Sequence, residues 1–184
     1  MSVHPLELLF RDLTDRSFTR IGLKEPEIPR YVSHLLLDFT EMEHLYRIRD
    51  ARGRKLEDVG ELLLEGDVRH RARSFERERT VRKHIGDFTL FFAGMFPEHI
   101  HNRRHWWRLD RNVDWIEAGR ESYRVVSTFD VGEHAGEAPL FRKLAEHFDF
   151  MVVGINLVRE ELITMSEERF LIARSVLDDP PPTH

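Results

Sequence analysis

The apolar residues of this chain recur at intervals of three and four along almost its whole length, and sustained alternation of every second residue is hard to find. Such spacing places side chains on one face of an α-helix, whereas a strand needs a period of two. The pattern therefore predicts an all-α fold, a bundle of about seven helices. Because 184 residues can form one core, we expect a single domain over residues 1–177 and a disordered tail, 178–184, with three consecutive prolines.

The longest predicted helix, residues 68–96, is the expected centre of this bundle. Its first half is charged and should face solvent, while its second half is apolar nearly all round and should be buried. Gly86 and Gly94 fall in the apolar half. A helix tolerates the cost of a glycine, about 1 kcal/mol, where a neighbouring segment comes close, so we expect tight helix crossings at both positions. Pro97 should end this helix.

Six further helices are expected around the central one. Their ranges are 5–18, 28–48, 55–65, 112–130, 139–163 and 167–177. Gly22 and Gly66 stand where a helix C-terminal cap is expected. Pro139 suits a first helical position, and Ser166 is the expected N-cap of the last helix.

Composition excludes several classes of site. The chain has no cysteine, which excludes disulfides, thiolate catalysis and cysteine-ligated metals. Its formal net charge of -5 argues against a general polyanion binder, although a local basic face is compatible with it. The first residues lack the pattern of a secretory leader, and no run of 18 apolar residues occurs. We therefore expect a cytoplasmic protein without a signal peptide or membrane contact.

Three stretches of the chain resemble uncharacterised bacterial all-helical proteins. They are Tyr46-Arg-Ile-Arg-Asp-Ala-Arg-Gly, His84-Ile-Gly-Asp-Phe-Thr-Leu-Phe-Phe and Gly119-Arg-Glu-Ser-Tyr. The resemblance covers most of the chain and implies a helical fold. It implies no activity, ligand or catalytic residue.

Histidines and carboxylates at helical spacing form the first candidate site, for which a divalent metal is the possible cofactor. Two Glu-x-x-His pairs occur, Glu41 with His44 and Glu98 with His101, and ferritin-like bundles place such pairs around two metal ions. His101 and His105 are four residues apart and suit a shared ion if they lie on one helical turn. Two Glu-x-x-His pairs are also few enough to arise by chance in a chain with this many glutamates and histidines. The candidate ligands are Glu41, His44, His84, Asp87, Glu98, His101 and His105, with His147 as a further one.

His84 and Asp87 fall on the apolar half of the predicted central helix. A buried charge is costly unless it is paired or hydrogen-bonded, so both side chains need partners. One interpretation is structural, a core histidine and carboxylate that satisfy neighbouring polar groups. The alternative is a metal ligand or general base with a shifted pKa.

Arginine and tryptophan residues interleave in a second candidate site, which suits a partner protein or phosphate groups and bases. Its residues are Arg103, Arg104, Trp106, Trp107, Arg108 and Arg111. A further basic stretch consists of Arg69, Arg71, Arg73, Arg77, Arg79, Arg82 and Lys83. Together the two stretches are candidates for one basic face, although alternating charges are also typical of solvated helices.

Several enzyme signatures are absent from the sequence, including the Walker loop, the dinucleotide fingerprint, the Gly-x-Ser-x-Gly elbow and the His-Glu-x-x-His helix. We therefore favour a non-enzymatic protein-interaction or assembly module that self-associates or binds a partner protein through residues 103–111. A metal-binding helical bundle is one alternative. Binding of a nucleic acid or nucleotide through the basic stretches is the other.

Overall fold

The computed structural model describes residues 5–98 and 113–178, with side chains up to residue 168. This part of the chain contains eight α-helices, no β-strand and one isolated bridge between Arg49 and Lys55. The all-α prediction is confirmed. The helices are α1 (Pro5–Arg20), α2 (Glu27–Asp38), α3 (Met42–Leu45), α4 (Val59–Glu65), α5 (Phe75–Met95), α7 (Trp115–Val126), α8 (Ala138–Glu146) and α9 (Phe148–Asp178), with a 3-10 turn, η2 (Gly132–His134), before α8.

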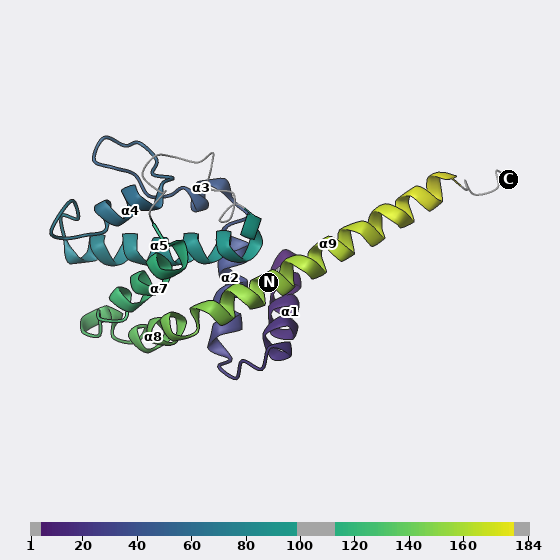
Figure 1. The fold of residues 1–184 in the computed structure, drawn as a ribbon, viewed down its shortest axis with the longest axis horizontal. Helices are drawn as coiled ribbons and strands as arrows, with labels where there is room; N and C mark the ends of the chain where they lie inside the picture. The colour runs from purple at the N-terminus through teal and green to yellow at the C-terminus, as the bar shows by residue number, and fades with distance from the viewer. Residues whose placement is uncertain (1–4, 99–112, 179–184) are drawn as a thin grey trace.

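Helix α5 is the central helix of the molecule. It packs against α7 more extensively than any other described pair of helices, and it also contacts α9 and α4 (Figure 1). Helices α1 and α2 pack on each other, and α1 also contacts α9. The C-terminal part of α9 extends away from the other helices (Figure 1). Within the described residues, no helix has the length and apolar character needed to cross a membrane.

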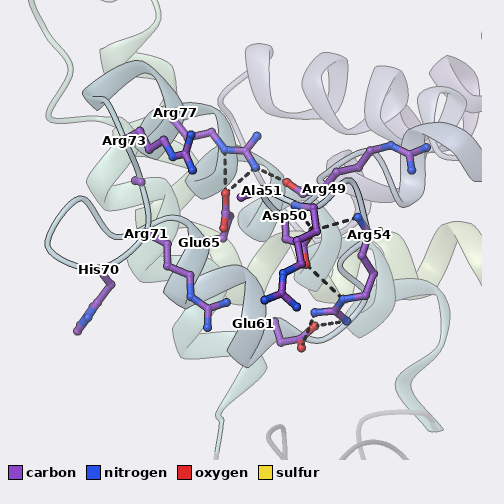
Figure 2. Close-up of a pocket in the computed structure, with 12 residues that line it drawn as sticks. Arg49, Asp50, Ala51, Arg54, Glu61, Glu65, His70, Arg71, Arg73 and Arg77 are labelled. Carbon is purple, nitrogen blue, oxygen red and sulfur yellow. Dashed lines mark hydrogen bonds and ion pairs between the residues drawn. The ribbon is translucent and has the colours of Figure 1, made fainter.

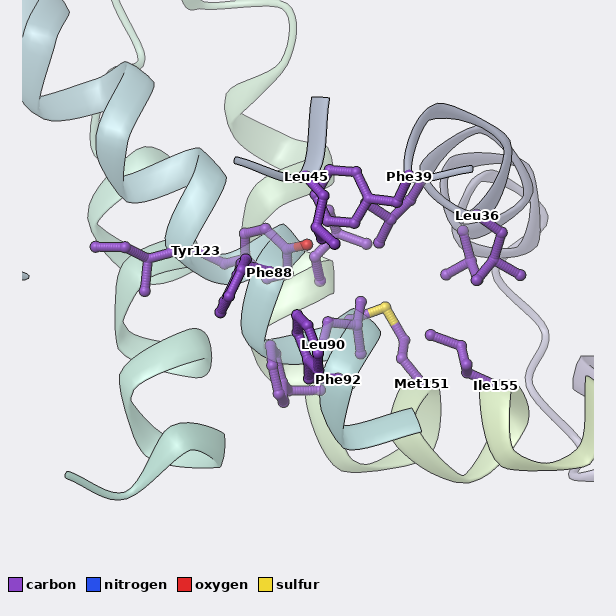
Figure 3. Packing of buried hydrophobic residues seen from close by; sticks show 14 of the residues in the cluster. Leu36, Phe39, Leu45, Phe88, Leu90, Phe92, Tyr123, Met151 and Ile155 are labelled. Atoms are coloured by element: carbon purple, nitrogen blue, oxygen red, sulfur yellow. The ribbon is translucent and has the colours of Figure 1, made fainter. Parts of the chain in front are cut away.

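All eight helices contribute to one cluster of buried hydrophobic residues. Figure 3 shows its middle, where Phe88, Leu90 and Phe92 of α5 lie close to Met151 and Ile155 of α9. The rings of Phe88 and Phe92 are stacked at an angle with centroids 4.7 Å apart. The prediction that the apolar second half of the central helix lies inside the molecule is confirmed.

Several predicted helix boundaries are also confirmed. Helices α1 and α7 match the predicted segments 5–18 and 112–130 to within a few residues. Gly22 has a φ of 78°, in the left-handed region that favours glycine after a helix. Gly66 is the C-cap of α4, and Pro139 lies in the first turn of α8.

The prediction of one helix over residues 28–48 is wrong, because the chain breaks between α2 and α3. The Thr40 hydroxyl donates a hydrogen bond to the Leu37 carbonyl at 2.7 Å and so competes with the continuing backbone ladder. Apolar spacing does not detect this local competition. Met42, an apolar residue within the predicted helix, is consequently 64% exposed.

The predicted helices at 139–163 and 167–177 are also wrong. The helical backbone stops at His147, between α8 and α9, and the break leaves Phe148 fully buried at the start of α9. Helix α9 then runs through Ser166, which is therefore not an N-cap. With 31 residues, α9 and not the central α5 is the longest described helix.

Helices α4 and α5 begin later than the predicted 55–65 and 68–96. Side-chain caps set both starts: Asp58 and Ser74 each accept a hydrogen bond from the backbone N–H three residues further on, at 2.9 and 3.1 Å. Residues 66–74 form a loop instead of a first helical half. This loop brings several arginines out of the helix and into the neighbourhood of α4.

Two glycines of α5 allow the close helix crossings that the sequence predicts. A Cβ atom on Gly86 would lie 2.3 Å from Cε1 of Tyr123 in α7, and one on Gly94 would lie 2.4 Å from Cγ2 of Ile155 in α9. Cβ atoms essentially never approach other atoms so closely. Glycine at these positions therefore lets α7 and α9 pack directly on the central helix.

We predict that Gly86→Ala lowers the free energy of unfolding by about 2 kcal/mol, since overpacking costs more than the roughly 1 kcal/mol that alanine adds to helix propensity. Chemical denaturation measures this change. Gly136→Ala is the control, because a Cβ atom there meets nothing within 4 Å. A stabilised Gly86→Ala variant would contradict the close crossing.

Candidate functional site

The carboxylate of Asp87 lies on the buried surface of α5 and binds side chains from two other helices. Its Oδ1 accepts hydrogen bonds from the hydroxyls of Tyr31 in α2, at 2.5 Å, and Tyr123 in α7, at 2.7 Å. Its Oδ2 accepts from the ammonium group of Lys83, one turn earlier in α5, at 2.7 Å. Three donors thus satisfy a carboxylate that would otherwise be costly to bury.

Both tyrosines of this network remain protonated. Burial, followed by the charge of Asp87, raises the pKa of Tyr31 and Tyr123 well above the ordinary tyrosine value. The rings also pack together, with the Tyr31 ring edge-on to the Tyr123 ring. The network is therefore a set of fixed hydroxyl donors around one anion, which corresponds to the structural interpretation of Asp87.

We predict that Tyr123→Phe lowers the free energy of unfolding by about 2 kcal/mol, the usual worth of a hydrogen bond to a charged group. Tyr46→Phe is the matched control, because the Tyr46 hydroxyl makes no hydrogen bond to a described residue, and we expect a change below about 0.5 kcal/mol. Urea denaturation compares the two. Equal effects would show that Asp87 does not depend on the Tyr123 hydroxyl.

His84 is 3% exposed and lies between the aromatic rings of Phe39 and Phe88. Its Nε2 is buried and has no hydrogen-bond partner among the described residues. Burial lowers the pKa of His84 from 6.5 to about 4, against the opposing influence of Asp87. The imidazole is therefore neutral at physiological pH, and its charged form is excluded from this part of the core.

We predict that His84 makes the protein sensitive to acid. Above pH 6.5 the histidine is neutral in both the folded and the unfolded chain, but between pH 6.5 and 4 only the unfolded chain takes up the proton. Stability should fall across this window by roughly 3 kcal/mol, because one pKa unit corresponds to about 1.4 kcal/mol.

Denaturation at a series of pH values measures this loss in the parent chain and in His84→Leu. The variant should show a clearly flatter pH dependence. His34→Gln, at an exposed histidine, serves as the control. If His84→Leu and the parent chain lost the same stability between pH 6.5 and 4, the buried imidazole would not be the cause.

A pocket of about 570 Å³ lies next to Asp87 and is lined by residues of α1, α2 and α5 and of the segment around α3. We call it the Asp87 pocket. Tyr31 and Asp87 line it together with two leucines of α2, Leu35 and Leu37. Its remaining lining residues are polar: Glu7, His34, Asp38, Glu41, His44 and Lys83. The pocket thus gathers three of the predicted metal-ligand candidates, Glu41, His44 and Asp87.

These side chains already have partners or lie too far apart for one ion. Nδ1 of His44 lies 2.7 Å from the Asp38 carboxylate, without hydrogen-bond alignment, and its Nε2 lies 3.6 Å from Glu41. Asp38 also pairs with Arg47. In the described part of the chain, the one trio of carboxylate and histidine atoms within 4.8 Å of one another lies elsewhere, at Glu76, Glu133 and His134.

The other predicted metal ligands do not join the Asp87 pocket. Glu98 lies 3.5 Å from the guanidinium of Arg159, and His147 lies 3.9 Å from Glu25. His101 and His105 fall outside the described residues, so the proposed ferritin-like arrangement stays a prediction. The described residues alone do not form it.

A second hollow, of about 1090 Å³, lies between the loop at 49–54, α4 and the loop that precedes α5. We call it the arginine groove. Six arginines line it: Arg49, Arg52, Arg54, Arg71, Arg73 and Arg77. Three carboxylates, Asp50, Glu61 and Glu65, also line it, which leaves an excess of three positive charges.

Half of these arginines are held by ion pairs. Arg54 binds both oxygens of Glu61, at 2.9 and 3.1 Å, and also contacts Asp50. Arg77 binds Glu65 at 2.8 Å and donates to the Arg49 carbonyl at 2.6 Å. Arg49 lies 3.8 Å from Glu43, outside the groove. These pairs fix the walls of the groove.

The side chains of Arg52, Arg71 and Arg73 have no ion pair or hydrogen bond with any described residue, and all three are exposed. Figure 2 shows Arg71 extending toward the side where Arg54 and Glu61 lie, whereas Arg73 lies beside Arg77. His70 points away from the other labelled residues. Within the described part of the chain, three guanidinium groups along the groove are thus available to a ligand.

The predicted basic stretch at 69–83 is divided in the structure and does not form one face. Arg79 is buried, pairs with Glu137 and lies over the ring of Phe141. Arg82 donates to the Gly66 carbonyl, and Lys83 belongs to the Asp87 network. The groove instead combines part of this stretch with the loop at 49–54, whose arginines were not identified as site residues. Their signal in the sequence is the Arg-x-Arg-Asp-x-Arg-x-Arg run.

The second predicted site, Arg103, Arg104, Trp106, Trp107, Arg108 and Arg111, lies outside the described residues. Its role therefore stays a prediction. Comparison of the chain with models of known protein families, with curated proteins and with solved structures finds no match. The geometry of the two hollows is accordingly the basis for a functional proposal.

Proposed function

We propose that the protein is a binding module that holds a phosphate-bearing polyanion, single-stranded nucleic acid, in the arginine groove. The observation that carries the proposal is a set of three exposed arginines that have no side-chain partner among the described residues, Arg52, Arg71 and Arg73. They lie in a groove with an excess of positive charge. Guanidinium groups bind phosphate through two parallel hydrogen bonds, and phosphate contacts dominate the affinity of proteins for nucleic acids.

The size of the groove favours an extended ligand over a single phosphate. Its volume of about 1090 Å³ lies slightly above the usual range for pockets that hold small molecules, roughly 300 to 1000 Å³. The free arginines are also spread out, with Arg71 on the side of Glu61 and Arg73 on the side of Glu65 and Arg77 (Figure 2). A chain of phosphates can contact both regions at once.

The lining of the groove favours binding without sequence preference. Among the described residues that line it there is no phenylalanine, tyrosine or tryptophan, and the imidazole of His70 points away from the other labelled residues (Figure 2). Bases therefore have no large aromatic ring to stack on between the arginines, and the ligand is recognised through its phosphate backbone.

The negative charge of the whole chain does not oppose this proposal. The formal net charge is -5, but the interactions of exposed charges are largely screened beyond about 8 Å at physiological ionic strength. A phosphate in the groove is therefore influenced mainly by the arginines beside it. The predicted interaction of residues 103–111 with a partner protein or a second copy stays a prediction, since these residues lie outside the described part of the chain.

We predict that the protein binds a fluorescent oligothymidylate at low salt and that Arg71→Ser/Arg73→Ser weakens this binding at least about fivefold. The salt dependence should change as well. Each lost phosphate contact reduces the slope of log K against log salt by about 0.7, so the double variant should lose about 1.4. Fluorescence anisotropy at several salt concentrations measures both quantities.

Arg11→Ser/Arg142→Ser is the matched control, because both arginines are exposed, lie outside the groove and change the net charge equally. It should keep nearly the parent affinity. No binding at low salt, or equal loss in both double variants, would overturn the proposal. Competition by inorganic polyphosphate distinguishes recognition of phosphate from recognition of the nucleic acid itself.

A further inference from the structure

The Asp87 pocket carries the opposite charge to the arginine groove and takes no part in the function proposed above. Four carboxylates line it, those of Glu7, Asp38, Glu41 and Asp87. Among its described lining residues, Lys83 is the one side chain with an ammonium or guanidinium group. An acidic hollow of this kind favours a cationic ligand.

The carboxylates of this pocket differ in how far they are already neutralised. Asp87, at the buried end, is paired with Lys83, and Asp38 is paired with Arg47. Glu7 makes no ion pair or side-chain hydrogen bond with a described residue, and within the same part of the chain the Glu41 carboxylate contacts only the imidazole of His44, at 3.6 Å. Two carboxylates are thus left to bind an added positive charge.

The arrangement of these groups does not suit a single metal ion. An ion needs several ligand atoms about 2.0 to 2.6 Å from one centre, which places them close to one another. The pocket contains no three carboxylate or histidine atoms within 4.8 Å of one another, as the described residues show. A ligand whose positive charges are separated along a chain can reach carboxylates that one ion cannot.

The pocket also offers apolar surface between its charges. Leu35 and Leu37 line it, as does Tyr31. Removal of methylene groups from water is favourable, so such a wall favours an aliphatic chain between the charged groups. The volume of about 570 Å³ lies within the range of small-molecule sites.

We propose that the Asp87 pocket binds an aliphatic diamine or polyamine. One ammonium group lies at Glu7 and another at Glu41, while the methylene chain between them contacts the two leucines. Asp87 and Lys83 form the neutral floor of the site. The ligand is held by separated ion pairs and apolar contact, without a metal ion.

Calorimetric titration of the full chain with spermidine and with putrescine tests this proposal. Saturable binding is expected, and Glu7→Gln/Glu41→Gln should weaken it about tenfold, the combined effect of two exposed ion pairs. The neutral analogue 1,4-butanediol should not bind, because it has the chain but not the charges. Circular dichroism and thermal denaturation check that each variant is folded.

The matched control is Asp15→Asn/Glu146→Gln, which removes two exposed carboxylates outside the pocket and changes the net charge equally. It should retain the parent affinity for spermidine. The proposal is overturned if this control loses as much affinity as the pocket variant, if Mg²⁺ displaces spermidine at equal concentration, or if neither amine binds. The first two outcomes identify a general counterion effect, and the third identifies a pocket with a different ligand or none.

Discussion

The buried carboxylate of Asp87 is the interaction on which the arrangement of the central helices depends. It receives hydroxyl groups from α2 and α7 and an ammonium group from its own helix, so one anion joins three helices. The neighbouring Gly86 makes this possible, because the ring of Tyr123 occupies the space where a Cβ atom would lie. The close packing of α7 on α5 and the hydrogen bond from Tyr123 to the Asp87 carboxylate are therefore two consequences of the same helix crossing.

The Asp87 network also reaches one of the two hollows at the surface of the molecule. Asp87 and Lys83 lie at the boundary between the core and the Asp87 pocket, and neutralise each other there. The arginine groove lies elsewhere, around α4 and the start of α5. Asp58 and Ser74 are the N-caps of these two helices, and the loops that precede them carry most of the arginines of the groove. Since one hollow has an excess of carboxylates and the other an excess of arginines, the modest net charge of the chain conceals two surfaces of opposite sign.

The sequence predicts the features of this structure that depend on residues close to one another along the chain. The burial of the apolar half of α5 and the close approaches at Gly86 and Gly94 follow from composition within one helix. The break after α2 and the break at His147 were not predicted, since apolar spacing continues through both. A hydroxyl that bonds to a nearby carbonyl, as that of Thr40 does, ends a helix without changing the pattern of hydrophobic residues.

The sequence by itself determined that the chain is helical, which segment lies at the centre, and that His84 and Asp87 need an explanation as polar residues in an apolar helix. Tertiary structure alone decided what satisfies them and where the candidate sites lie. Asp87 meets Tyr31 and Tyr123 across 56 and 36 residues, and the arginine groove joins loops from either side of α4. The physical reason is the separation of the interacting residues along the chain. Helical periodicity reflects residues within one or two turns of each other, whereas these ion pairs, hydrogen bonds and pockets join segments that are remote in the sequence.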